Sequence, residues 1–369
     1  MLLPKYIIGI SLFLGLFAPL SEANAGLYGF DSINPYTEEE NILHMAYLPE
    51  KIINYRNEMR NNLLMLIDYA HSQNPDFQII SHEGQDLLTK SRWEYALEGY
   101  NKVRLQKIGI DDPYFLFNQN ISLLPTIEGS PEHRYQNAVD SIVINNLYCG
   151  KGYEQDYTFN NNIGHITIEH CQTEDALDRA VARSLLDEKA IFAFTNKSLA
   201  FSDIKSQLLI NDSARNIKKV SQAKNISFLL DDHLYDTAED MIKAISDTNY
   251  DVVIIKPIFQ NSYPFTKEDI KRLSLKKNGA QRLIIALLNV SEASYKDYFW
   301  NPHWKLGNPS WLIRESFVSP NTYITQYWNE EWKTIISNYF KDIVTTGYSG
   351  VFFTGIENHQ YFEHQTPLE

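Results

Sequence analysis

The sequence predicts an α/β protein, a single (β/α)8 TIM barrel with loop insertions, and three observations lead to this fold class. Short apolar runs of strand length recur along the chain and are continuous rather than alternating, which is typical of parallel strands buried on both faces. Segments with helical periodicity separate these runs. A doubly wound open sheet is the alternative fold, and the lack of a Gly-x-Gly-x-x-Gly or phosphate-binding loop in the sequence disfavours it.

Eight apolar segments are predicted to be strands of this sheet. They span residues 77–80, 140–148, 190–195, 206–212, 226–232, 251–256, 282–290 and 351–353. Residues 150–172 are predicted to be an inserted excursion containing a hairpin, outside the main sheet. Eight strands in the residues 26–369 that remain after a predicted signal peptide suit a barrel with insertions.

Helix ends are predicted from residues that cap them. Thr173 is a good helix start because Glu174 and Asp175 place acids in the first turn. Thr266 with Asp269 resembles a capping box. Gly347 is predicted to end the long helix that precedes the last strand.

The first residues have the pattern of a secretory signal peptide. Lys5 precedes a continuous apolar run, and Ala23-Asn24-Ala25 is a small-x-small cleavage pattern. The run is too short and wrongly flanked for a membrane span. We therefore expect residues 1–25 to be a signal peptide and residues 26–369 to be the barrel of an exported protein with no membrane span.

Composition and charge exclude some partners. The chain is 44% hydrophobic and 21% charged, which is ordinary for a globular protein with a sizeable core. Its formal net charge is −13 and no basic cluster stands out, so nucleic acids and anionic membranes are poor candidates as partners.

The cysteine count predicts a disulfide rather than a metal site. There are two cysteines, Cys149 and Cys171, and a pair outside the cytosol more often forms a disulfide. No His-x-x-Cys grouping lies near them, so neither a metal nor another cofactor is predicted.

A family resemblance is carried by an ordered set of segments in the second half. The strand LIIALLNV (283–290) runs into Ser291-Glu292-Ala293-Ser294-Tyr295, NPSWL (308–312) follows, and Tyr327-Trp328 precedes a helix led by Trp332. This string resembles the endo-α-1,4-polygalactosaminidase-type glycoside hydrolases, which are exported TIM-barrel proteins. The resemblance is strongest over residues 225–362.

The first half resembles the same family in a different order. Residues 57–88, 135–148 and 189–196 are similar to family segments that follow the strand matching residues 351–353, but here they precede it. The resemblance therefore implies a circularly permuted barrel, which barrels tolerate because their ends close on themselves. Two separate half-size domains are the alternative, and each half alone could not close a sheet.

The resemblance also implies which side chains carry the chemistry. Glycoside hydrolysis uses two carboxyl groups, which in a barrel lie at the carboxyl ends of strands. Positions that are acidic in the family are mostly replaced here, by Asn145, Thr195, Lys256, Ser294, Tyr295 and Thr354. Glu292 is retained and Glu357 occupies the position of a later acid, so these two residues are the predicted catalytic pair, with acid and base roles left open.

Other residues are predicted to bind the substrate at the same mouth. The polar candidates lie at predicted strand ends and are His82, Glu83, Asp231 with its neighbour Asp232, and Lys256. The aromatic candidates are Trp300, Trp311, Tyr327 and Trp328, because flat rings cover the apolar faces of sugars. The structural alternatives are solvated loop acids for the first group and loop packing for the second.

The resemblance implies an exported hydrolase-like protein that acts on or binds a polysaccharide, with galactosamine-containing polymers as the implied class. Because most family acids are replaced, we expect the pair Glu292 and Glu357 to face the mouth in a geometry poorer than that of a working pair. A catalytically inactive barrel that binds a glycan or a partner is the alternative function. A lectin-like or scaffolding role without sugar is a third.

Overall fold

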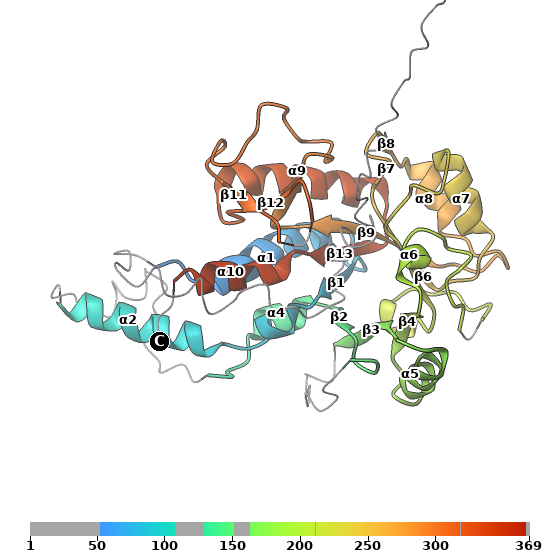
Figure 1. Ribbon diagram of the computed structural model, residues 1–369, viewed down its shortest axis with the longest axis horizontal. Coiled ribbons are helices and arrows are strands. Elements are labelled where there is room, and N and C mark those ends of the chain that lie inside the picture. Colours follow the sequence, from blue (N-terminus) through green and yellow to red (C-terminus); the bar gives the residue numbers. More distant parts are fainter. Residues whose placement is uncertain (1–51, 108–127, 151–162, 211, 318, 367–369) are drawn as a thin grey trace, which may run out of the picture.

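The computed structural model describes residues 52–107, 128–150, 163–210, 212–317 and 319–366 (Figure 1). The predicted signal peptide lies outside these residues. In the part of the chain that the structure describes, no helix is long and apolar enough to cross a membrane.

The centre of the molecule is a parallel sheet of eight strands. The strands are β1 (Gln78–His82), β2 (Ser141–Asn145), β3 (Gly164–His170), β4 (Ala190–Phe194), β5 (Ile226–Leu229), β6 (Val252–Ile255), β9 (Leu283–Asn289) and β13 (Gly350–Thr354). They follow one another in chain order around the sheet, and β13 pairs with β1. A single bridge between Ile191 and Asn225 joins β4 to β5, so the sheet is nearly closed, as in a TIM-like barrel.

Two strand predictions were wrong. Residues 164–170, predicted to belong to a hairpin outside the sheet, form β3, which pairs with both β2 and β4. Their alternating pattern arises because Ile166 and Ile168 face the barrel interior, while Thr167 and Glu169 are buried on the outer side. Residues 206–210 form no strand, since the place beside β4 is taken by β3 on one side and β5 on the other.

Helices cover the outside of the barrel. They are α1 (Tyr55–Gln73), α2 (Arg92–Lys107), α4 (His133–Ala138), α5 (Glu174–Leu186), α6 (Lys197–Ala200), α7 (Ala238–Ser246), α8 (Lys267–Leu273), α9 (Glu330–Thr346) and α10 (His359–His364). Short 3-10 turns are η3 (Gly84–Leu87), η4 (Val220–Gln222) and η5 (Ile356–Asn358). In Figure 1, α1 packs beside α9 and α10 at one side of the barrel, and α7 packs beside α8 at the other.

The predicted caps are confirmed. The Thr173 hydroxyl accepts a hydrogen bond from the backbone N–H of Ala176, and Thr266 and Asp269 form a reciprocal capping box. Gly347 ends α9 in the left-handed conformation.

Small extra sheets sit in the loops after β6 and β9. The first pairs β7 (Ile258–Phe259) with β8 (Tyr263–Pro264). The second has the order β10 (Glu292–Ser294), β12 (Thr322–Thr325) and β11 (Leu312–Glu315). This second sheet begins directly after β9 and therefore covers the carboxyl end of that strand.

The barrel interior is apolar along most of its length and polar at one end. A buried cluster of Ile, Val, Leu and Phe side chains fills it, including Ile80, Val143, Ile168, Phe192, Phe228, Ile254, Ile285 and Phe352. Two residues further along four of these strands, the inward positions hold His82, Asn145, Lys256 and Thr354. The inward-facing side chains of these strands thus change from apolar to polar between two successive inward positions.

The structure joins Cys149, after β2, to Cys171, after β3, in a disulfide with a Cα–Cα distance of 5.2 Å. The carboxylate of Glu169 accepts hydrogen bonds from the backbone N–H groups of Tyr148 and Cys149, at 3.0 and 2.9 Å. The disulfide and the Glu169 contacts together hold the loop after β2 against β3.

Gly355, directly after β13, is predicted to tolerate no side chain. Its φ is +75°, and an added Cβ would press on Asn289 Oδ1 and Ser291 Oγ. Gly279 is a matched control, because its φ is +86° but nothing lies within 4 Å of the same atom. Gly279→Ala should cost about 1–2 kcal/mol from the left-handed backbone alone. Gly355→Ala should cost roughly 2 kcal/mol more, from overpacking.

Urea unfolding of both variants checks this prediction. Equal losses in the two variants would mean that the loop after β13 moves aside and is not packed as described.

Candidate active site at the carboxyl ends of the strands

The loops after β1 and β2 bring His82, Glu83 and Asn145 together. The Asn145 amide donates to Glu83 Oε1 at 2.6 Å and lies 3.1 Å from His82 Nε2. His82 is buried and its ring packs edge-on against Phe352 of β13, with 5.6 Å between the centroids. Glu83 has a φ of +48°, an unusual backbone for a residue other than glycine, and such conformations are common where a site must aim a side chain.

Glu357 reaches the same place from the loop after β13. It lies in η5, and Gly355 makes the turn that precedes it. Its Oε2 is shielded from solvent and has no hydrogen-bond partner among the described residues. The ionisable groups of His82, Glu83 and Glu292 act electrostatically on its carboxyl group, which follows β13 at the carboxyl ends of the strands.

Glu292 follows β9 and is held by two neutral donors. Asn289 Nδ2 donates to its Oε2 and Ser316 Oγ donates to its Oε1, both at 2.9 Å. Ser316 comes from the loop between β11 and β12, so this loop reaches over the end of β9. The two hydrogen bonds fix the orientation of the Glu292 carboxylate.

The carboxyl groups of Glu83 and Glu357 titrate near neutral pH. Burial raises the pKa of Glu357 to about 7, and the charges of Glu83 and Glu292 add to this while His82 opposes it. Burial likewise raises the pKa of Glu83 to about 7, against the hydrogen bond from Asn145. Burial lowers the pKa of His82, which is therefore mostly neutral at pH 7.

Lys256 acts electrostatically on a carboxyl group that the sequence analysis missed, that of Asp297. Burial raises the pKa of Asp297 to about 6, and the charge of Lys256 opposes this rise. The Asp297 carboxylate also accepts a hydrogen bond from the backbone N–H of Ser294 at 2.7 Å. Asp297 lies only five residues after Glu292. This short spacing from Glu292 is the sequence feature that could have identified Asp297 as a candidate.

Asp231 and Asp232 are not brought into this group. Asp231 pairs with His233 of its own loop at 2.8 Å, and Asp232 accepts from the backbone N–H of Gln260 at 2.6 Å. Their contacts are those of loop-stabilising acids.

Two of the four predicted sugar-facing rings are core residues. Trp311 is 0% exposed and packs against Trp332, and Tyr327 is 1% exposed and donates its hydroxyl to the carbonyl of Tyr55. The prediction for these two residues was wrong, because the long loop needs its own core. Trp300 and Trp328 are half-buried, so part of each side chain is open to solvent.

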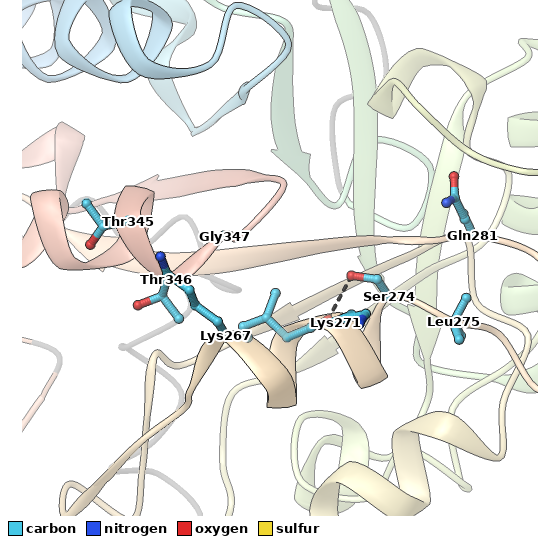
Figure 2. A pocket seen from close by; sticks show the side chains of 9 residues that line it. Lys267, Lys271, Ser274, Leu275, Gln281, Thr345, Thr346 and Gly347 are labelled. Atoms are coloured by element: carbon cyan, nitrogen blue, oxygen red, sulfur yellow. Dashed lines mark hydrogen bonds between the residues drawn. The ribbon is translucent and has the colours of Figure 1, made fainter.

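A groove of about 550 Å³ lies at the opposite end of the barrel, between α8 and the end of α9 (Figure 2). Lys267, Lys271, Thr345 and Thr346 line it. It is remote from the carboxylates and adjoins the amino ends of β9 and β13, the face of a barrel associated with stability rather than catalysis. Among the residues that the structure describes, no group of three or more His, Cys, Asp or Glu side chains could hold a metal ion.

Comparison with known proteins gives relatives without an assigned activity. The chain is 28% identical over 154 residues to an uncharacterised protein of Methanocaldococcus jannaschii, covering 41% of this chain and 42% of that protein. It is 27% identical over 81 residues to one of Thermotoga maritima (22% and 25%), and 24% identical over 125 residues to one of Deinococcus radiodurans (34% and 39%). The chain thus spans less than half the length of each of these relatives. No family model matches the chain.

The raised pKa of Glu357 predicts that the free energy of unfolding falls as the pH rises. Its pKa is about 7 in the folded protein and 4.5 in the reference state. Between these values the folded state holds a proton that the unfolded chain has released. The stabilisation is therefore complete below about pH 4.5 and lost as pH rises through about 7. At 1.36 kcal/mol per pKa unit, and with discount for partial solvent contact, the loss is on the order of 2 kcal/mol.

Urea unfolding between about pH 5 and pH 8 measures this loss. Glu357→Gln should remove the part of this stability loss that comes from Glu357. Glu83 and Glu169, whose pKa values are also raised to about 7, should still contribute their parts. Glu268→Gln, on the exposed face of α8, is the control. The same pH slope in Glu357→Gln as in the parent protein would contradict the assignment.

Proposed function

We propose that the protein is an exported glycoside hydrolase that acts on a polysaccharide, with Glu357 as the general acid and Glu292 as the base or nucleophile. One observation carries this proposal: Glu357, whose pKa is raised to about 7, and the hydrogen-bonded carboxylate of Glu292 follow the paired strands β13 and β9 at the mouth of a parallel barrel. Paired carboxyl groups in different environments are the requirement of glycoside hydrolysis.

The acid role falls to Glu357 because of its protonation. Its raised pKa of about 7 keeps part of its carboxyl groups protonated near neutral pH, and this form can protonate the leaving oxygen of a glycosidic bond. Glu292 receives hydrogen bonds from Asn289 and Ser316 and so is held in one orientation for the second role. Neutral His82 and Asn145 are placed to bind sugar hydroxyl groups.

The substrate class rests on charge and on the family resemblance. Glu292 and Asp297, together with the partly ionised Glu83 and Glu357, outnumber Lys256 among the described charged residues of the mouth. An acidic site attracts a cationic polymer, and galactosamine-containing polysaccharides are of this kind. The pattern of Lys5 and Ala23-Asn24-Ala25 supports export to where such polymers occur.

We also propose that the barrel is circularly permuted. The seam between β4 and β5 supports this, because one bridge joins these strands whereas the other neighbours pair over several residues. The described residues between β4 and β5 form the short helices α6 and η4 and no longer helix that would cover the barrel. In the unpermuted order of the family, this seam would hold the two chain ends.

A catalytically inactive glycan-binding barrel is the second candidate. Lys256, Thr354 and Asn145 occupy inward strand-end positions where the resemblance leads one to expect acids, and this favours binding without cleavage. The two candidates share the mouth and differ in whether Glu292 and Glu357 turn over a substrate.

Hydrolysis of poly-α-1,4-galactosamine, measured by release of reducing ends, separates the two candidates. Glu292→Gln and Glu357→Gln should each lower kcat by a factor of about 10²–10⁴. Loss of Glu357 should also remove the basic limb of the pH profile, since that limb reports the acid. Glu268→Gln is the control and should be fully active. Activity that survives in both amide variants would exclude this pair.

Glycan binding tests the second candidate. Trp300→Ala and Trp328→Ala should each weaken binding of the same polymer about tenfold, which corresponds to roughly 1.4 kcal/mol. Trp311→Ala should instead lower stability by about 3–5 kcal/mol, because it empties a core site. Isothermal titration and thermal melting give the two readouts. Unchanged affinity in both half-buried variants would assign these rings to packing.

A further inference from the structure

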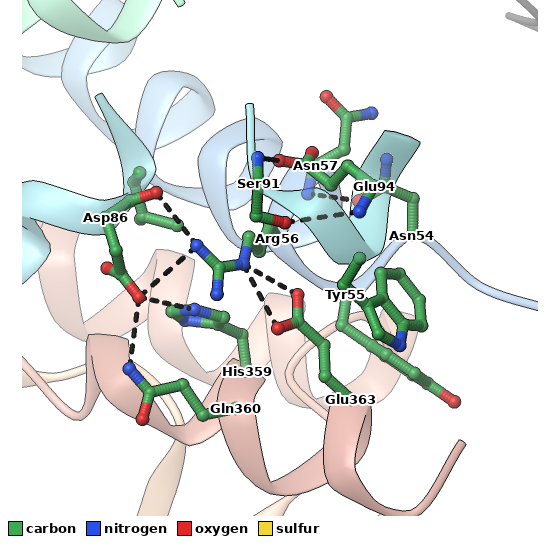
Figure 3. Close-up of polar contacts among 12 residues, drawn as sticks. Asn54, Tyr55, Arg56, Asn57, Asp86, Ser91, Glu94, His359, Gln360 and Glu363 are labelled. Atoms are coloured by element: carbon green, nitrogen blue, oxygen red, sulfur yellow. Dashed lines mark hydrogen bonds and ion pairs between the residues drawn. The ribbon is translucent and has the colours of Figure 1, made fainter. Parts of the chain in front are cut away.

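A partly buried polar network connects the loop after β1 to the loop after β13 (Figure 3). Asp86 lies in η3, three residues after Glu83, and His359 begins α10, two residues after Glu357. His359 Nε2 lies 3.0 Å from Asp86 Oδ2. The two residues that make this contact thus belong to the loops that carry Glu83 and Glu357.

His359 is held as a cation by its surroundings. It is 0% exposed, and its Nδ1 faces the backbone carbonyl of Ile356 at 2.8 Å while its Nε2 faces Asp86. Both partners are acceptors, so both ring nitrogens must donate, and only the doubly protonated ring can do this. Burial would lower the pKa of His359, but the Asp86 carboxylate outweighs it and raises that pKa.

Two further residues, Gln360 and Arg56, also contact the carboxylate of Asp86. Its Oδ2 also accepts from Gln360 Nε2 at 3.0 Å and lies 3.5 Å from Arg56 Nη1. The Arg56 Nε in turn donates to Glu363 of α10 at 2.8 Å (Figure 3). The network therefore contains two cations and two anions, and it anchors η3 and α10 to α1.

In the described part of the chain, no backbone hydrogen bond joins these two loops. The pairing of β1 with β13 ends at Ser81 and Phe353. Beyond that point, the hydrogen bonds of Asp86 to His359 and Gln360 are the ones that join residues 83–88 to residues 355–360 in the described structure.

We propose that Asp86 and His359 are positioning residues that hold Glu83 and Glu357 close together in a water-poor mouth. The catalytic consequence rests on the proposed function, whereas the positioning is a property of the loops themselves. If the Asp86–His359 contact is broken, the loops separate and water reaches both carboxyl groups. The pKa of Glu357, now about 7, then falls toward its ordinary value of 4.5.

Carbon-13 NMR titration of the glutamate side-chain carboxyl groups tests the positioning without any substrate. The Glu357 signal is assigned by its disappearance in Glu357→Gln. Asp86→Asn and His359→Gln should each lower its apparent pKa by about one unit or more. Arg272→Gln, which breaks the exposed ion pair with Glu239, is the control and should leave it unchanged. An unchanged Glu357 titration in both Asp86→Asn and His359→Gln would overturn the proposal.

Nitrogen-15 NMR of histidine in the unmodified protein tests the same proposal if these variants do not fold. Both ring nitrogens of His359 should be protonated at pH 7. A neutral His359 ring at that pH would contradict the ion pair on which the positioning depends.

Hydrolysis assays on the same variants separate this inference from the proposed function. A shifted titration in a protein without hydrolase activity would support the positioning and overturn the hydrolase proposal alone. Hydrolysis by a protein whose variants leave the Glu357 titration unshifted would support the hydrolase proposal and overturn the positioning. If both hold, the basic limb of the kcat profile should move down in pH by the same amount as the Glu357 titration.

Discussion

The near-closure of eight parallel strands into one sheet is the constraint on which the rest of this structure depends. Because all strands run the same way, their carboxyl ends meet at one rim, and loops distant in sequence become neighbours there. Pairing of β13 with β1 brings Glu357 beside Glu83 although 274 residues separate their numbers. Without this pairing, the acidic residues would be isolated loop carboxylates.

The rim is divided into a polar half and an apolar half. His82, Asn145, Lys256 and Thr354 mark the polar half, on β1, β2, β6 and β13. Across the mouth the His170 ring stacks on Phe194 at 5.2 Å, and Leu230 belongs to the interior cluster. A mouth with this division fits a ligand that has polar edges and an apolar face, which is the property of sugars behind the proposed function.

The loops keep the carboxyl groups in place at an energetic cost. Ser291 Oγ donates to the carbonyl of Gly355 at 2.5 Å and accepts from Asn358 at 2.8 Å, so the loops after β9 and β13 are locked together. Glu83 has a positive φ, and Glu357 has a shielded oxygen without a hydrogen-bond partner among the described residues. The rim therefore stores strain that the barrel beneath it offsets. A rigid scaffold that supports a costly site is common where chemistry is carried out.

The sequence by itself determined the helix caps, most of the strands and the barrel class, because capping, apolar runs and helical periods are local properties. It also predicted Glu292 and Glu357 as the catalytic pair, through a resemblance rather than through a physical argument, and this pair stays a prediction. Tertiary structure alone decided that residues 164–170 join the sheet, since the burial of Glu169 and Thr167 comes from elements packed outside the barrel. Only the fold could separate Trp311 from Trp300, or join Asp86 to His359, because burial and the pairing of residues 273 apart depend on closure and not on local pattern.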